Sequence, residues 1–321
     1  VRMFLREYTQ PSEWDEFLAF FDPQSHDTVQ VLPAIHYARE GRQPIMRFFT
    51  ISDQEGEAPA YGYIVNDSKL TGMFVYVVPN GPYLPLLLRY GMSRIMTFCV
   101  DRFYEVRTCI ILADLDGTDV SIQLATFEYA RATQKLFPGQ KFYMTQEQTE
   151  ELLKLDLPLP EGFHYDEIDV DRDLETVHAT WRHAENLEAT RTLVQVYPSA
   201  CVRHTASGNI AAWELSSSFG MLTHLFVMEE YRKLGLGVTT ELYLSQRLAR
   251  LGFRPYKFVE TFNTGVLRSS HAHRLWTGCF DEREGEEREQ KLYVFFLLKY
   301  YVDPVEPQPS LEEASLQETS V

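Results

Sequence analysis

The first 155 residues combine two hydrophobic patterns, one typical of strands and one typical of helices. Short apolar runs, divided by turns that contain Asp and Gly, indicate buried strands. These expected strands are 48–51, 60–65, 73–78 and 108–113. Segments with apolar residues on one face indicate helices at 12–18, 92–103 and 120–135. Helices interleaved with strands predict an α/β domain.

The remainder of the chain has the same mixture of patterns. Strands are expected at 163–168, 200–204, 257–261 and 291–298, with a hairpin over 209–228 that turns near 218–220. Helices are expected at 173–183, 188–197 and 266–276, and another begins near residue 237. This order predicts a second α/β unit with a mixed sheet.

The segment 155–162 separates these two parts, because its two prolines and its glycine interrupt any regular element. After residue 303, Pro, Glu and Ser dominate and no apolar periodicity remains, which predicts disorder. The predicted parts are an N-terminal α/β domain at 1–155, a second domain at 160–300 and a disordered acidic tail at 303–321.

The formal net charge is −16, from 30 basic and 46 acidic residues. Such a charge repels phosphate backbones and argues against nucleic-acid binding. No uninterrupted apolar run approaches the roughly 20 residues that cross a bilayer, so we expect no membrane association. Residues 1–22 mix acidic and aromatic side chains, unlike a secretory signal or a transit peptide, and we expect a cytoplasmic or mitochondrial location. The 4 cysteines have no paired spacing, which favours free thiols in a reducing compartment.

The segment 231–237, directly after the apolar run 222–228, carries the most specific chemistry. It reads Tyr-Arg-Lys-Leu-Gly-Leu-Gly, with R-x-x-G-x-G spacing between an expected strand and an expected helix. Such a turn presents consecutive backbone N–H groups at the positive end of a helix dipole, which is a site for a pyrophosphate. Gly235 and Gly237 let the backbone approach the anion, because no side chain intervenes.

This pattern resembles the acetyl-coenzyme A signature of the GNAT acyltransferase superfamily. Its flanks are similar to the C-terminal domain of glycine N-acyltransferases, namely 198–202, 212–215, 230–232 and 251–256. The resemblance spans about 160–285. It implies a C-terminal GNAT fold, acyl-coenzyme A as co-substrate and glycine or a similar small amine as acceptor. It also suggests that the first domain is a diverged, GNAT-like second copy.

The resemblance also implies which residues bind the cofactor. In GNAT folds, the strand before the glycine turn separates from its neighbour and binds the amide-rich pantetheine arm. Here that strand carries Leu225, Phe226 and Val227. The turn, expected to hold the pyrophosphate, comprises Arg232, Lys233, Leu234, Gly235, Leu236 and Gly237. Asn263 either contacts the cofactor, as the family suggests, or caps the following helix.

The catalytic base is the point where this sequence departs from the family. The glycine-family pattern has a Glu just after the hairpin glycine, and Met221 occupies that position here. If 217 pairs with 221, then Glu214 faces His224 across the hairpin, and a His held by a carboxylate is a candidate base. The alternative is a polar pair with a structural role. Met221 also supports a second hypothesis, a GNAT-fold binding protein with impaired catalysis.

Two further motifs point elsewhere. The run Asp114-Leu115-Asp116-Gly117-Thr118 after a strand resembles the nucleophile loop of haloacid-dehalogenase-type phosphatases, but the later elements of that fold are missing from the sequence. The C-terminal residues Thr319-Ser320-Val321 resemble a ligand of PDZ domains. His271 and His273 lie two apart on an expected helix and do not share a face, so we expect no metal site.

Overall fold

The computed structural model describes residues 3–42, 45–54, 56–68, 72–80, 86–88, 90–92, 94–95, 108–114, 132–184, 186–280 and 292–300. The strands are β1 (Phe4–Tyr8), β2 (Ile45–Ser52), β3 (Tyr61–Ser68), β4 (Gly72–Pro79), β5 (Thr108–Asp114), β6 (Ala132–Tyr143), β7 (Phe163–Asp166), β8 (Ser199–His204), β9 (Ile210–Ser216), β10 (Met221–Val227), β11 (Tyr256–Glu260), β12 (Thr277–Gly278) and β13 (Leu292–Tyr300). The α-helices are α1 (Trp14–Ala19), α2 (Val31–Arg39), α5 (Gln146–Leu153), α6 (Val170–Ala179), α7 (Leu187–Val196), α8 (Leu236–Arg250) and α9 (Thr264–Ala272).

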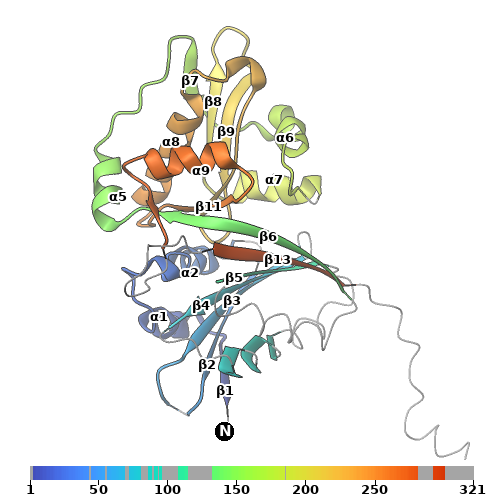
Figure 1. Cartoon of the computed structure of the whole chain (residues 1–321). Coiled ribbons are helices and arrows are strands. Elements are labelled where there is room, and N and C mark those ends of the chain that lie inside the picture. Colours follow the sequence, from blue (N-terminus) through green and yellow to red (C-terminus); the bar gives the residue numbers. More distant parts are fainter. Residues whose placement is uncertain are drawn as a thin grey trace, which may run out of the picture.

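The strands form one mixed sheet, in the order β1-β2-β3-β4-β5-β13-β6-β11-β10-β9-β8-β7, and β12 pairs with β6. Adjacent strands are antiparallel except for β4 with β5 and β10 with β11. This arrangement confirms the predicted α/β class with a mixed sheet. It also shows that strands from both parts of the chain share one hydrogen-bonded ladder, which runs through the whole molecule (Figure 1).

The two halves of the chain repeat the same order of main strands and of the first two helices. The first half contains β1, α1, α2, β2, β3, β4, β5 and β6, and the second contains β7, α6, α7, β8, β9, β10, α8, β11, α9 and β13. Their last strands are exchanged, because β13 pairs with β5 of the first half and β6 pairs with β11 of the second. Figure 1 shows β6 and β13 side by side where the halves meet. The boundary at 155–160 falls between α5 and β7 and remains a prediction.

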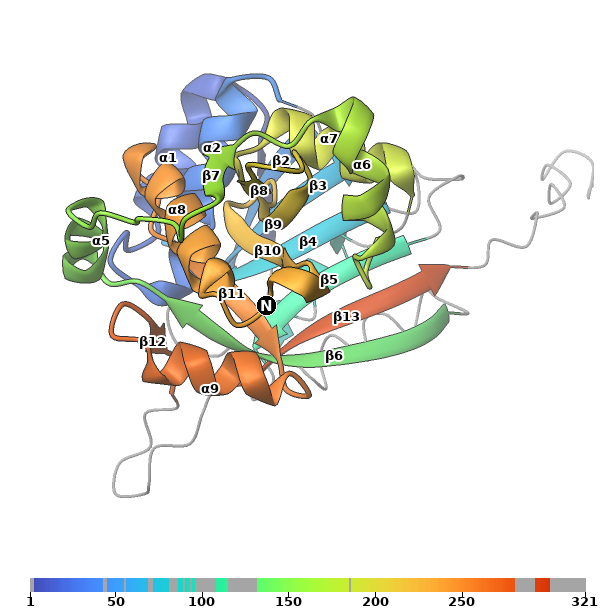
Figure 2. The ribbon, with the colours of Figure 1, turned by 90° about the horizontal axis from the view of Figure 1, so that it is seen from above.

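The helices of the second half lie on both faces of the sheet. Leu242, Leu244 and Leu248 of α8 pack with Ala200 of β8 and Leu222 of β10. On the opposite face, Val177 of α6 and Val194 of α7 pack against Trp213 and Leu215 of β9. Figure 2 shows α8 on one side of β9 and β10, with α6 and α7 on the other. We call these surfaces the α8 face and the α6 face.

Most expected elements of the second half are confirmed, and their ends follow from helix caps. Helix α6 begins at Val170 instead of 173, because the Asp169 carboxylate accepts hydrogen bonds from the backbone N–H groups of Asp171 and Arg172. Asn186 caps α7 in the same way. The hairpin turns where expected, since the Ser217 N–H donates to the carbonyl of Met221.

The helix predicted at 120–135 is wrong over residues 132–135, which belong to strand β6. Strand β6 pairs with β13 on one side and with β11 on the other, so its conformation depends on contacts distant in the sequence. The strand also places Phe142 and the stem of Lys141 in the buried interior. Helices α2 and α5 and strand β1 are further elements that the hydrophobic pattern did not predict.

Several predictions fall on residues outside the described ranges. These are residues 96–103 and 120–131 of the expected helices, the acidic tail with its PDZ-like Thr319-Ser320-Val321, and 115–118 of the phosphatase-like motif. Cys201 and Cys279 are buried free thiols, whereas the side chains of Cys99 and Cys109 are not described. In the described part of the chain, no helix is both long and apolar enough to span a membrane.

Candidate active site

Strands β10 and β11 separate soon after they begin. Their parallel ladder consists of two pairs, Met221 with Tyr256 and Leu222 with Lys257. Beyond these pairs β10 continues to Val227 and β11 to Glu260, without pairing to each other. The two strands therefore enclose a wedge that opens toward their C-terminal ends. Beyond Leu222, the backbone groups of β10 that face this wedge have no partner on β11, which suits pairing with an extended ligand that carries amides.

A β-bulge lies in β10 beside the wedge. The β9–β10 register pairs Thr223 with Leu215 and then Phe226 with Trp213, so an extra residue stands between these pairs. His224, within the bulge, has a φ of 54°, a left-handed conformation that is uncommon outside glycine. The bulge bends the strand and increases its local twist, which helps to turn β10 away from β11.

The bulge overturns the predicted cross-strand pair of Glu214 and His224. Glu214 is buried on the α8 face, close to Glu241 and Lys257. Burial, followed by the repulsion of Glu241, holds the pKa of the Glu214 carboxyl well above its usual range. Lys257 Nζ instead pairs with Glu241 Oε2 at 2.5 Å. Simple alternation predicted a contact between Glu214 and His224, but the extra residue rotates His224 to the other face.

His224 is held on the α6 face by helix α6 and the residues that follow it. Its Nε2–H donates to the carbonyl of Val177 at 2.8 Å, and its ring stacks on Trp181 with centroids 5.2 Å apart. Burial lowers the pKa of His224 to about 4. Because its pKa is so low, the His224 ring is a weak proton acceptor near neutral pH. The catalytic roles of His224 and Glu214 therefore remain predictions, and the geometry favours a structural role for each.

The glycine turn forms the N-terminus of α8, as the sequence predicts. Gly235 is the N-cap residue with a φ of 80°, and no side chain caps the helix. A Cβ atom added to Gly235 would meet nothing within 4 Å, so the space in front of the helix is open. Lys233 also adopts a left-handed conformation, with a φ of 65°. The uncapped N–H groups of the first turn are available to an anion.

The other predicted cofactor residues occupy different positions. Leu236 is buried beneath the turn, so only its backbone faces a ligand, whereas Leu234 is 46% exposed. The Arg232 Nε–H donates to the carbonyl of Val227 at 3.2 Å, which ties the turn to the end of β10. The Phe226 ring stacks on Trp213, so its side chain belongs to the core of the α6 face.

Asn263 caps helix α9. Its side-chain oxygen accepts a weak hydrogen bond from the Val266 N–H at 3.4 Å. This contact supports the capping alternative, and it leaves the amide nitrogen of Asn263 for another partner. His271 and His273, on and just after the same helix, have separate surroundings, since the His271 ring bonds to Gln140.

No sequence motif pointed to the connection between α6 and α7. Its residues Trp181, Arg182 and His183 follow α6 directly and contact both edges of the wedge. Trp181 stacks on His224 of β10, and His183 Nε2 lies 3.1 Å from Glu260 Oε2 of β11. A run of aromatic and basic residues between two helices was the available signal, but nothing in the sequence indicated that it lies over the wedge.

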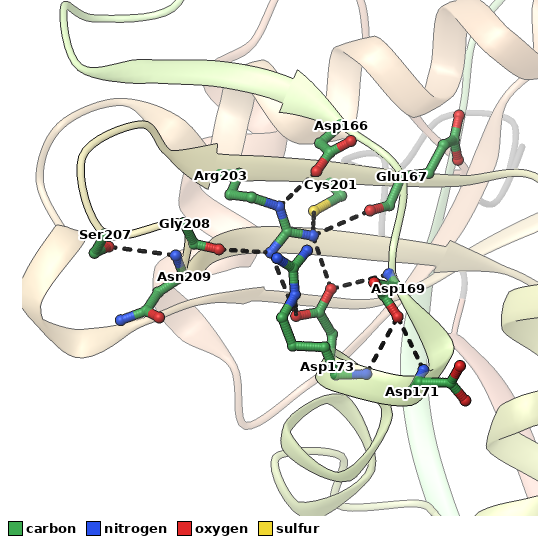
Figure 3. Close-up of polar contacts among 11 residues, drawn as sticks. Asp166, Glu167, Asp169, Asp171, Asp173, Cys201, Arg203, Ser207, Gly208 and Asn209 are labelled. Atoms are coloured by element: carbon green, nitrogen blue, oxygen red, sulfur yellow. Dashed lines mark hydrogen bonds and ion pairs between the residues drawn. The ribbon is translucent and has the colours of Figure 1, made fainter.

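A buried polar network fixes the other end of α6 (Figure 3). The Arg203 guanidinium, on β8, donates to Asp173 Oδ2 at 2.8 Å and to Asp166 Oδ2 at 2.5 Å. It also donates to the carbonyls of Gly208 and Glu167. Because Asp173 lies in the first turn of α6, this network anchors the helix whose far end carries residues 181–183.

No protein-family model and no curated protein sequence matches the chain. Solved structures do match. The match to a Drosophila protein from a structural genomics programme covers 92% of this chain and 98% of that protein, with a TM-score of 0.68 and 15% sequence identity. The match to a GCN5-related N-acetyltransferase from Sphaerobacter thermophilus covers 92% of this chain and 95% of that protein, with a TM-score of 0.51 and 14% sequence identity. The match to a tandem GNAT protein from the clavulanic acid biosynthesis pathway covers 93% of this chain and 98% of that protein, with a TM-score of 0.52 and 11% sequence identity.

These similarities extend over nearly the whole chain, so they concern both halves and not the second half alone. They confirm the predicted fold, including a GNAT-like first half. At these levels of identity they establish the fold and not the substrate. The chain therefore has the mixed α/β fold of tandem GNAT proteins.

Proposed function

We propose that the protein is an acyl-coenzyme A-dependent N-acyltransferase whose reaction takes place in the second half. The observation that carries this proposal is the wedge between β10 and β11, which opens after two register pairs. The wedge lies directly before an uncapped helix N-terminus with a glycine at the cap. Together these features offer a backbone ladder for pantetheine and an anion site for the pyrophosphate, in the order in which the cofactor carries these groups.

The cofactor is expected to lie along β10, with its pyrophosphate at the first turn of α8. The backbone groups of Leu225, Phe226 and Val227 would pair with the pantetheine amides. The N–H groups of Gly235, Leu236 and Gly237 would bind the pyrophosphate, since they lie at the positive end of the helix dipole. Arg232 and Lys233 add positive charge at the turn in a chain whose net charge is −16.

The acceptor is expected to approach from the α6 face. Leu222 packs against α8, so its neighbour Met221 points to the opposite side of the sheet by strand alternation. Glycine or a similar small amine is the acceptor that the resemblance to glycine N-acyltransferases supports. Met221 cannot accept a proton, so the reaction needs another base, or the protein binds the cofactor without turnover.

The test is thiol release from acetyl- and benzoyl-coenzyme A, with and without a panel of amino acids, together with calorimetric measurement of coenzyme A binding. Glycine-dependent thiol release would support the proposed activity. Binding without release would support the second hypothesis, a GNAT-fold binding protein, and absence of binding would overturn the assigned cofactor site. Met221→Glu is a complementary variant, because a gain in rate would show that a base at this position reaches the acceptor.

A further inference from the structure

The wedge has a second ionisable pair, formed by His183 and Glu260. His183 Nε2 lies 3.1 Å from Glu260 Oε2, and their side chains are 41% and 23% exposed. His183 lies in the α6–α7 connection, and Glu260 is the last residue of β11. We propose that His183 is the general base that deprotonates the acceptor amine and that Glu260 is its positioning residue. This inference rests on the proposed acyltransferase function.

The pair lies on the face that the acceptor is expected to approach. Lys257 of β11 points to the α8 face, where it pairs with Glu241. Successive side chains of a strand alternate between faces, so Glu260, three residues later, points to the α6 face. The contact of Glu260 with His183, from the α6–α7 connection, agrees with this alternation.

Neighbouring contacts hold His183 close to both strands of the wedge. Trp181, two residues before it, stacks on His224 in the bulge of β10. The Arg182 guanidinium lies 4.5 Å from the ring centroid of Phe262, just after β11. Consecutive residues of one connection thus contact β10 on one side and the end of β11 on the other. The His183 ring also packs against Phe137 of β6, with centroids 5.2 Å apart, so it lies over β11, at one edge of the wedge.

The hydrogen bonds of the two histidines at the wedge distinguish their chemistry. The carboxylate of Glu260 accepts from Nε2–H of His183, which leaves the Nδ1 lone pair as the basic atom. In the described part of the chain, no protein group bonds to that Nδ1. His224, in contrast, is buried and holds α6 through the carbonyl of Val177. Only His183 therefore combines a carboxylate partner, solvent access and an available ring nitrogen.

The proton balance of the reaction fits this assignment. Nδ1 of His183 takes a proton from the incoming ammonium, and the neutral amine forms a C–N bond with the thioester carbonyl carbon. The C–S bond breaks and the coenzyme A thiolate leaves. The second proton, released as the amide forms, goes to the thiolate, and the imidazolium returns the first proton to solvent. Glu260 stays ionised and stabilises the imidazolium.

Other charged groups surround the His183 ring in the described structure. Arg182 is its sequence neighbour, and His178 and His183 both lie close enough to His224 to help lower the pKa of that buried ring. Cationic neighbours disfavour the imidazolium, whereas the Glu260 carboxylate favours it. The pH dependence of turnover should therefore change when Glu260 is replaced, because Glu260 is the acidic side chain bonded to this ring.

The experiment compares His183→Gln and Glu260→Gln with the wild-type chain, and uses His164→Gln as a matched control. His164 lies on the edge strand β7 and bonds to Thr205, away from the wedge. With glycine as acceptor, His183→Gln should lower kcat by about 100-fold, with coenzyme A affinity unchanged by calorimetry. Glu260→Gln should move the rising limb of the pH profile to lower pH, because the imidazolium loses its carboxylate. A merely structural role for Glu260 would not move that limb.

The acceptor provides a second readout. Hydroxylamine is a neutral amine at pH 7 and needs no base for its deprotonation, so His183→Gln should transfer acyl groups to it at near the wild-type rate. Equal losses with glycine and hydroxylamine, or no loss with glycine, would overturn the role of His183 while leaving the acyltransferase intact. Failure of the wild-type chain to bind coenzyme A or to acylate any amine would instead overturn the proposed function, and the assignment of His183 with it.

Discussion

The two halves of the molecule share one order of main strands and differ where the parallel strand pair forms. In the first half, β4 and β5 pair over four consecutive residues, from Met73 with Cys109 to Tyr76 with Leu112. In the second half, β10 and β11 pair over two residues and then separate, beside a bulge. The β3–β4 ladder has a regular register, whereas the β9–β10 ladder shifts. The same fold thus gives a longer parallel ladder in one half and an earlier separation of the strands in the other.

The residues that follow β4 and β10 also differ between the two halves. Strand β10 leads to the glycine turn and helix α8. After β4 the sequence reads Asn80-Gly81-Pro82-Tyr83-Leu84-Pro85, whose two prolines lack a backbone N–H group. Consecutive N–H donors, which an anion requires, are therefore encoded after β10 and not after β4. This sequence difference favours the second half as the place of the proposed cofactor site.

The largest expected effect is loss of cofactor binding when the glycine turn is altered. Gly235 and Gly252 both have left-handed conformations, with φ of 80° and 84°, and neither has an atom within 4 Å of an added Cβ. Gly235→Glu and Gly252→Glu should therefore cost similar stability, about 1–2 kcal/mol each. Gly235→Glu alone should weaken coenzyme A binding by about 100-fold, because a carboxylate would face the pyrophosphate and displace charge-assisted hydrogen bonds. Calorimetry and thermal melts of both variants provide the measurement, and equal affinities would contradict the assigned site.

The second effect concerns an arginine on the second strand of each half and its acidic partner, which lies on α6 for Arg203 and on β1 for Arg47. The Arg203 side chain is 4% exposed and that of its partner Asp173 is 3% exposed, whereas Arg47 and its partner Glu7 are 14% and 28% exposed. Arg203→Met should cost about 3–5 kcal/mol of unfolding free energy, since it leaves a buried carboxylate without its partner. Arg47→Met should cost about 1 kcal/mol or less, because solvent reaches Glu7. Urea unfolding would test this, and equal costs would show that burial does not distinguish the two pairs.

The third effect is a pH dependence of stability that arises from His224 in the bulge of β10. The pKa of His224 is lowered from 6.5 to about 4 by burial, so the unfolded state binds its proton more readily. The wild type should therefore lose stability as pH falls from 6.5 to about 4, by about 3 kcal/mol at most. His224→Asn removes this titration, so its stability relative to the wild type should improve over the same range. Unfolding at several pH values would test this, and a constant difference would show that the His224 ring is accessible to protons in solution.

Local sequence patterns predicted much of the second half, because its elements carry their own signals. The hairpin turn and the glycine turn before α8 each depend on residues within a few positions of one another. The exchange of β6 and β13 between the halves depends on pairing over long sequence distances, which no local pattern reports. For the same reason, the local pattern predicted a helix over residues 132–135, which are the first residues of β6.

The candidate site shows the same division between local and distant information. The strand, turn and helix of the proposed anion site were predictable, because they follow one another in the sequence. The Glu214–His224 pair was predicted from strand alternation, which a bulge of one extra residue inverts. The His183–Glu260 pair joins residues 77 positions apart and depends on how α6 packs on the sheet. No spacing rule could have found it.

The smallest expected effect is a change in coenzyme A affinity when Asn263 of the second half is replaced. It distinguishes a residue that only caps α9 from one that also contacts the cofactor. Its side-chain oxygen caps α9 through the Val266 N–H, which leaves the amide nitrogen for the cofactor. Asn263→Ser keeps a capping oxygen and removes the amide donor, whereas Asn263→Ala removes both. If the amide donates one hydrogen bond to the cofactor, Asn263→Ser should weaken coenzyme A binding by about 3- to 10-fold while stability stays close to wild type. Asn263→Ala should show the same loss of affinity together with about 1 kcal/mol of lost stability. Wild-type affinity in Asn263→Ser would assign this residue to the cap alone and would restrict the cofactor contacts to β10 and the glycine turn.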